Sequence, residues 1–183
     1  MTHRIMLMAD THGRTDFAVE PTGLVIHAGD LTRLGDLDEL EEQAKWLAWI
    51  PAERVVVIAG NHDLCFEKTP EEARAILDRY RITYLEDAGA EVLGYKIWGS
   101  PWSLECGYWA FMGDEAALAE KYAMIPDDID ILIAHGPPKG IGDRVWSGES
   151  VGSVALADAI ARVKPRLTVH GHIHEDIGVR RHP

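Results

Sequence analysis

Five short segments of the sequence place Asp, Asn or His directly after an apolar run. They are Asp10-Thr11-His12, Gly29-Asp30, Gly60-Asn61-His62-Asp63, His135-Gly136 and His170-Gly171-His172-Ile173-His174. Carboxylate, imidazole and amide oxygen atoms are ligands of divalent ions such as Mn, Fe and Zn. Because no cysteine belongs to these segments, the pattern excludes a thiolate site. The residue types therefore predict a metal centre built from oxygen and nitrogen donors.

The number of candidate donors indicates more than one ion. A tetrahedral ion takes four ligands, whereas two ions that share a bridging carboxylate take more. The five segments together offer more oxygen and nitrogen donors than one tetrahedral ion can bind. Taken singly, Asp-x-His or Gly-Asp carries little information, and a lone His at a strand end is more often a hydrogen-bonded surface residue. All five segments in this order argue against coincidence and favour a dinuclear site.

The apolar runs before these segments predict buried β strands over residues 5–9, 24–28, 55–59, 131–134 and 167–169. Helical spacing predicts helices over residues 36–50, 70–80, 114–122 and 152–163, and a hairpin is predicted at 90–98. Strands that alternate with helices indicate a layered α/β fold. In such folds ligands bind outside the carboxyl ends of the strands, so we expect the five segments to meet at one edge.

Composition limits the classes of partner. The chain has 183 residues and a formal net charge of −12, with nine histidines counted as neutral. This length favours a single domain spanning residues 1–183. The acidity disfavours stable binding to DNA, RNA or an anionic membrane surface. Cys65 and Cys106 form no CxxC pair, and no apolar stretch is long enough to span a membrane, so we expect a cytoplasmic protein.

The five segments resemble the ordered signature of the calcineurin-like metallophosphoesterase superfamily, which is Asp-x-His, Gly-Asp, Gly-Asn-His, His and Gly-His-x-His. Further segments are similar to the metallophosphoesterase-domain proteins of animals and their bacterial relatives. These are Arg14 after the first segment, Gly99-Ser100-Pro101-Trp102 and His135-Gly136-Pro137-Pro138. The resemblance implies an α/β fold in which a two-layer β sandwich is flanked by helices, with the site at one rim.

The resemblance also implies roles for the donors. Asp10, His12 and His174 would hold one divalent ion, and Asn61, His135 and His172 the other. Asp30 would bridge the two ions, which would activate the water that attacks phosphorus. His62 would stay off the metals and protonate the leaving group as a general acid. Mn is the first expectation for both ions, with Fe, Zn, Ni and Co as alternatives.

Two residues are candidates for substrate contact. Arg14 could bind a phosphate oxygen, and it could equally be a solvated loop arginine. Trp102 is our candidate for a wall on the substrate side, the alternative being a large residue that pins a loop.

The sequence departs from the superfamily pattern in two places. Arg33 stands where many phosphatases carry an acid that orients the catalytic histidine, and Asp63 or Asp36 could serve instead. The chain ends at Pro183, soon after His174, so we expect a short or absent closing strand, and the oligomeric state stays open.

The resemblance implies a phosphodiesterase that acts on a small phosphoester, such as a cyclic nucleotide. A phosphomonoesterase or a nuclease would use the same chemistry, although the acidic composition disfavours a nuclease. The alternative from a different class is a metal-binding scaffold without catalysis. The intact donor set and His62 speak against the scaffold.

Overall fold

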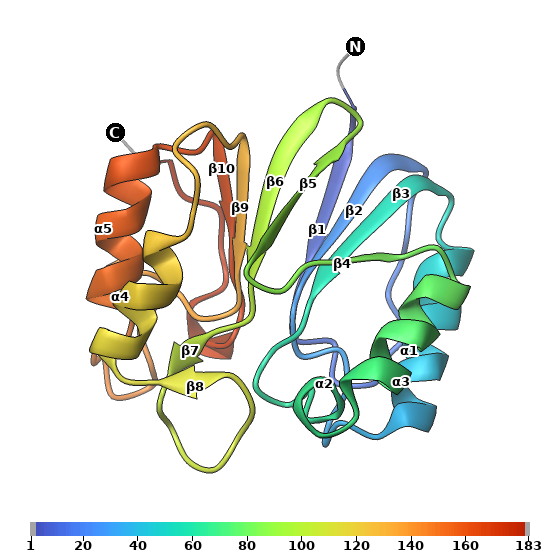
Figure 1. The fold of residues 1–183 in the computed structure, drawn as a ribbon, viewed down its shortest axis with the longest axis horizontal. Coiled ribbons are helices and arrows are strands. Elements are labelled where there is room, and N and C mark those ends of the chain that lie inside the picture. The colour runs from blue at the N-terminus through green and yellow to red at the C-terminus, as the bar shows by residue number, and fades with distance from the viewer. Residues whose placement is uncertain (1–2, 182–183) are drawn as a thin grey trace.

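A computed structural model describes residues 3–181 of the chain (Figure 1). Its strands are β1 (Ile5–Met8), β2 (Thr22–Ala28), β3 (Ala52–Ile58), β4 (Thr83–Tyr84), β5 (Ala88–Val92), β6 (Tyr95–Ser100), β7 (Ser103–Leu104), β8 (Met112–Gly113), β9 (Ile131–Ala134) and β10 (Leu167–Val169). Its helices are α1 (Leu37–Trp49), α2 (Cys65–Lys68), α3 (Pro70–Arg79), α4 (Glu115–Ala123) and α5 (Val154–Val163), followed by the 3₁₀ helix η1 (His174–Asp176).

Two four-stranded sheets form the two layers of the fold. The first has the strand order β1-β2-β3-β4 and is parallel throughout. The second has the order β10-β9-β6-β5, with only β5 antiparallel to its neighbour. Helices α1 and α3 cover the outer face of the first sheet, and α4 and α5 cover that of the second (Figure 1). The prediction of a two-layer α/β sandwich flanked by helices is confirmed.

Strand β2 shows why the sequence folds in layers. All seven of its residues are buried, because successive side chains point to opposite faces and both faces are covered. Ile26 packs between the sheets in one cluster with Ile58 of β3 and Ile133 of β9. Val25 faces the other way and belongs to the cluster that includes Leu40 of α1. An unbroken apolar run therefore marks a central strand.

The two outermost strands that lead into the site are less buried than expected. Strand β1 has no fully buried residue, and Leu7 is 43% exposed. In β10 only Val169 is buried. The prediction that both strands are fully buried was wrong, because each lies at the edge of its sheet with a neighbour on one side only.

The chain between β3 and β9 holds short elements that the sequence pattern did not predict. They are α2, β4 and the pair β7 and β8, each of two to four residues. No strand follows β10 in residues 170–181. Within residues 3–181, no helix has the length and apolarity needed to cross a membrane.

Candidate metal centre

The carboxyl ends of β1, β2, β3, β9 and β10 carry the predicted donors, and the fold brings them together. One set contains Asp10, His12 and His174, which we call the outer group. The Nε2 atoms of His12 and His174 lie 3.3 Å apart, and His174 Nε2 lies 3.5 Å from Asp10 Oδ1. These three residues can each offer one ligand atom to a common ion.

The second set contains Asn61, His135 and His172, which we call the inner group. Asn61 Oδ1 lies 2.9 Å from His135 Nε2 and 2.8 Å from His172 Nδ1. The three atoms come from loops after β3, β9 and β10, so both sheets contribute to one small cluster. An ion among them would replace these direct contacts.

Asp30 lies between the two groups and faces each with a different oxygen. Its Oδ2 is 3.7 Å from His12 Nε2 in the outer group, and its Oδ1 is 3.4 Å from His135 Nε2 in the inner group. The side chain is only 2% exposed, and Oδ1 also accepts a hydrogen bond of 2.9 Å from the His62 backbone N–H. This position suits a carboxylate that bridges two ions.

Four of the donors have an unusual backbone conformation. Asp10, His12, Asp30 and His172 have φ angles of 53°, 46°, 57° and 70°, in the left-handed region that non-glycine residues rarely adopt. Each such residue costs roughly 1–3 kcal/mol, so the surrounding structure must enforce the conformation. Backbone hydrogen bonds from Asp10 N to Gly29 O (2.9 Å) and from His12 N to Asp30 O (3.0 Å) do so. The strain indicates a functional site.

Two glycines leave room for the carboxylates. A Cβ on Gly60 would lie 2.3 Å from Asp30 Oδ1, and a Cβ on Gly171 would lie 2.4 Å from Asp10 Oδ2. Neither distance is compatible with a side chain. The glycines of Gly-Asn-His and Gly-His-x-His are therefore required by the close approach of the two acids.

The protonation pattern fits an ion in the inner group. His135 Nδ1 lies 2.9 Å from the Ala28 carbonyl oxygen, to which it donates its proton. In the neutral ring Nε2 then carries the lone pair, and that lone pair faces the cluster. Burial, followed by the charge of His135, lowers the pKa of His172 to about 4, which keeps this ring in its neutral, metal-binding form.

The acids of the centre are stabilised as carboxylates. Burial alone would raise the pKa of Asp30, but the positive charge of His135 and its hydrogen bond hold that pKa well below the usual range. Burial likewise opposes ionisation of Asp10, but its hydrogen bond with His174, the charge of His135 and the hydrogen bond from His172 N together lower its pKa. Burial opposes protonation of His135, but the charge of Asp30 and its hydrogen bond, together with the charge of Asp10, outweigh burial and raise the pKa of His135 to about 9. Without an ion, Asp30 and His135 therefore form an ion pair.

His62 lies beside the outer group. Its ring centroid is 4.6 Å from that of His12, and it stacks on Trp109 with centroids 4.1 Å apart. Its Nδ1 donates a hydrogen bond of 2.6 Å to the backbone oxygen of Arg33. His62 also falls in a possible ligand set with His12 and Asp30, so its role needs a direct test.

The expectation that Asp63 or Asp36 orients His62 was wrong. Asp36 caps α1 by accepting a hydrogen bond of 2.9 Å from Asp38 N. Asp63 is fully buried and accepts hydrogen bonds from the backbone N–H groups of Leu31, Thr32 and Gly60. It ties the loop of Asp30 to that of Asn61, and burial raises its pKa to about 6. The backbone carbonyl of Arg33, and not a side chain, accepts the hydrogen bond that orients His62.

The two candidate substrate contacts are not part of the donor cluster. The structure places Trp102 within the fold: its Nε1 donates to Asp87 at 2.8 Å, and Lys121 Nζ lies 4.3 Å from its ring centroid. These contacts correspond to the alternative of a residue that pins a loop. The guanidinium of Arg14 is exposed and pairs with Asp16 at 3.0 Å.

Two further residues border the cluster. One is Trp109, whose loop is drawn in by a hydrogen bond of 3.0 Å from Ala110 N to Asn61 O. The other is Cys106, whose Sγ lies 3.9 Å from His172 Nε2. Neither residue belongs to a sequence motif. Gly107, which follows Cys106, has a φ of 121° and marks a turn in this loop.

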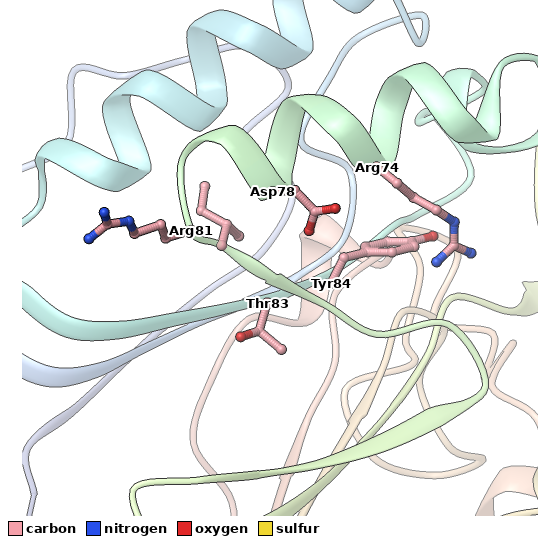
Figure 2. A pocket seen from close by; sticks show the side chains of 6 residues that line it. Arg74, Asp78, Arg81, Thr83 and Tyr84 are labelled. Carbon is pink, nitrogen blue, oxygen red and sulfur yellow. The ribbon is translucent and has the colours of Figure 1, made fainter.

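Two cavities differ in their relation to the cluster. One, of about 440 Å³, lies between α3 and β4, and no predicted donor lines it (Figure 2). In this cavity Arg74 pairs with Glu86 at 2.8 Å and covers the Tyr84 ring, so its charge is already matched. The other, of about 410 Å³, is lined by His172 and Gly136 and therefore adjoins the inner group.

Comparisons with known proteins agree with the geometry. The family model of the calcineurin-like phosphoesterases matches residues 3–176. Human metallophosphoesterase domain-containing protein 1 is 39% identical, over 96% of this chain and 62% of its own length. A UPF0046 protein of Caenorhabditis elegans is 34% identical, over 96% of this chain and 70% of its own. The chain thus spans less than two thirds of the human relative.

A solved structure supports the fold. The crystal structure of TT1561 of Thermus thermophilus superposes with a TM-score of 0.68, covering 92% of this chain and 81% of the other at 14% sequence identity.

Proposed function

The chain belongs to the calcineurin-like phosphoesterase family, and from this premise we propose that it is a metal-dependent phosphodiesterase acting on small substrates. The observation that carries the proposal is the position of Asp30 between two groups of donors, with one oxygen 3.7 Å from His12 and the other 3.4 Å from His135. The family implies divalent ions, and the donor atoms here converge as such ions require.

In the proposed mechanism, the residues of the outer group would hold one ion and those of the inner group the other, and Asp30 would serve as a ligand shared between the groups. When bound, two divalent ions supply a nucleophilic water at neutral pH and stabilise charge on the phosphoryl oxygens. Asn61 adds an amide beside those oxygens. The strained backbone and the glycines fix these side chains before substrate arrives.

His62 is proposed as the general acid. The Arg33 carbonyl accepts from Nδ1, so the proton to be transferred is the one on Nε2. As the P–O bond to the leaving group breaks, the departing oxygen takes this proton and leaves as an alcohol. Stacking on Trp109 restricts the plane of the ring during the transfer.

Charge favours a small substrate. Two divalent ions would outweigh the negative charges of Asp10 and Asp30, so the centre is locally positive within a chain of net charge −12. A single phosphodiester is attracted to such a spot, whereas a long polyanion also meets the acidic surface. We therefore propose small diesters, cyclic nucleotides included, with Mn²⁺ as the physiological ion. Two free cysteines, Cys65 and Cys106, support a cytoplasmic location.

An activity panel with added Mn²⁺ tests the proposal. It compares bis-p-nitrophenyl phosphate, p-nitrophenyl phosphate, and 2′,3′- and 3′,5′-cyclic nucleotides. We expect the diesters to be hydrolysed faster than the monoester. A protein that binds two ions and hydrolyses none of these would instead be a scaffold.

The variant His62→Ala tests the general acid. We expect turnover of alkyl esters to fall by about 10²-fold or more, while p-nitrophenyl esters, whose leaving group needs no proton, lose far less. Metal content should stay unchanged. His3→Ala, at the other end of β1, is the matched control. Loss of an ion in His62→Ala would make His62 a ligand rather than an acid.

A further inference from the structure

The cavity beside the inner group is built for an apolar occupant. It measures about 410 Å³ and opens between the loops after β7, β9 and β10. Apolar side chains dominate its walls; they include Leu104, Leu118, Tyr122, Val145 and Val151. A pocket of this size and lining fits a ring-sized organic group.

The polar groups of the cavity are acidic or neutral. Glu105 and Glu175 line it, and no Lys or Arg within residues 3–181 does. Ser103 lies in the same wall, only 1% exposed, and its Oγ has no hydrogen-bond partner among the described residues. A negatively charged occupant would meet the carboxylates of Glu105 and Glu175, which oppose the attraction that the ions of the centre would exert, whereas an uncharged occupant would not be repelled.

The cavity and His62 adjoin different donor groups. His62 contacts His12 of the outer group, with ring centroids 4.6 Å apart. The cavity is bordered by His172, whose Nδ1 faces Asn61 of the inner group, and His62 does not line it. A leaving group that receives its proton from His62 would lie beside the outer group. We therefore assign the cavity to the group that stays on phosphorus.

We propose that this cavity, lined by Leu104, Val151 and Glu105, selects phosphodiesters whose retained ester group is an uncharged, apolar ring. This inference rests on the proposed function and adds a substrate class to it. Diesters with a small retained group lose the apolar contact, and those with an anionic retained group are repelled.

Three diesters with the same leaving group test the inference: methyl, phenyl and 4-carboxyphenyl p-nitrophenyl phosphate. Each kcat/KM is divided by the rate of the same diester with hydroxide, which removes differences in intrinsic reactivity. We expect the phenyl diester to exceed the methyl diester by about tenfold or more, and the carboxyphenyl diester to fall below the phenyl diester by a similar factor. Equal values for the methyl and phenyl diesters would overturn the inference.

Two variants connect the selectivity to the cavity. Val151→Trp fills it, so the phenyl-to-methyl ratio of kcat/KM should fall toward one. Glu105→Gln, at an exposed position that tolerates change, should raise only the carboxyphenyl rate, by about three- to tenfold. Glu120→Gln, an exposed acid of α4, is the control for net charge. An unchanged carboxyphenyl rate in Glu105→Gln would contradict the role of charge.

The methyl diester separates the two hypotheses. If the wild type with Mn²⁺ hydrolyses none of the three diesters, the proposed phosphodiesterase function fails. If it hydrolyses the methyl diester and shows no preference among the three, the function stands and the cavity has no part in selection.

Discussion

The outer and inner groups of donors are alike in chemistry and differ in how firmly the fold holds them. In the outer group the side chains of His174 and His12 are 55% and 21% exposed. In the inner group His135 is fully buried and Asn61 is 2% exposed. Packing therefore restricts His135 and Asn61 of the inner group more than His12 and His174 of the outer group.

The difference follows from the elements that carry the two groups. His135 ends β9, a strand whose four residues are all buried, and its ring donates to the Ala28 carbonyl of the opposite sheet. His174 belongs to η1, a three-residue helix with no buried residue. One centre can therefore combine a tight site with an exchangeable one, and we expect the inner group to hold its ion more strongly.

Asp30→Asn should have the largest effect, because Asp30 directs one oxygen to His12 of the outer group and the other to His135 of the inner group. We expect both ions to be lost and turnover to fall on the order of 10³-fold or more. The buried His135 would also lose its counter-charge. Metal analysis after gel filtration and turnover of bis-p-nitrophenyl phosphate measure the two effects, with the exposed Asp16→Asn as control. Retention of both ions would show that Asp30 is not the bridge.

His135→Ala and His174→Ala compare the groups directly. Loss of the buried ligand should remove the inner ion at every Mn²⁺ concentration that keeps the protein soluble. Loss of the exposed ligand should weaken the outer ion by about 10–100-fold, so that added Mn²⁺ restores turnover. Titration of activity against free Mn²⁺ checks both. Rescue of His135→Ala but not of His174→Ala would reverse the assignment of the tight and the exchangeable site.

Trp109→Ala should have a smaller effect that is confined to the outer side. The stacking contact is worth about 0.5–1.5 kcal/mol, so its loss should lower turnover of alkyl esters by about three- to tenfold. Trp109→Phe should recover most of this loss because it keeps an aromatic face. Metal content should not change in either variant. An equal loss for alkyl and p-nitrophenyl esters would mean that Trp109 supports the loop and does not position His62.

The sequence predicted the framework of this comparison well. Apolar runs placed β9 and β10 at residues 131–134 and 167–169, the bounds that the structure has. The donors followed because strands of a parallel sheet end at the same edge, so residues far apart in sequence had to meet there. A sequence pattern shows which residues directly follow a strand.

The sequence could not predict contacts that no particular residue type marks. A backbone carbonyl orients His62, and since every residue has one, nothing in the sequence singles out Arg33. Trp109 reaches His62 only because its loop folds back onto Asn61. The exposure of β1 depends on which strand lies at the edge, and an apolar run looks the same at the edge and at the centre. For the same reason, the sequence could not predict the unequal burial of the two donor groups.

We expect the smallest effect from Glu115→Gln. This variant tests whether ion binding by the outer and inner groups depends only on the residues around each group. Glu115 of α4 accepts hydrogen bonds from Val154 N and Ala155 N at the start of α5, and although burial opposes ionisation, these bonds lower its pKa below the usual 4.5. A lowered pKa stabilises the fold above the unfolded-state value, and this stabilisation is lost as the pH falls through the folded-state value. Urea unfolding at pH 7 should show a small loss of stability that shrinks as the pH falls through the folded-state pKa of Glu115, with metal content at pH 7 equal to that of the wild type. If either group lost its ion in this variant, the difference between them would reflect the stability of the whole second sheet and not their own burial.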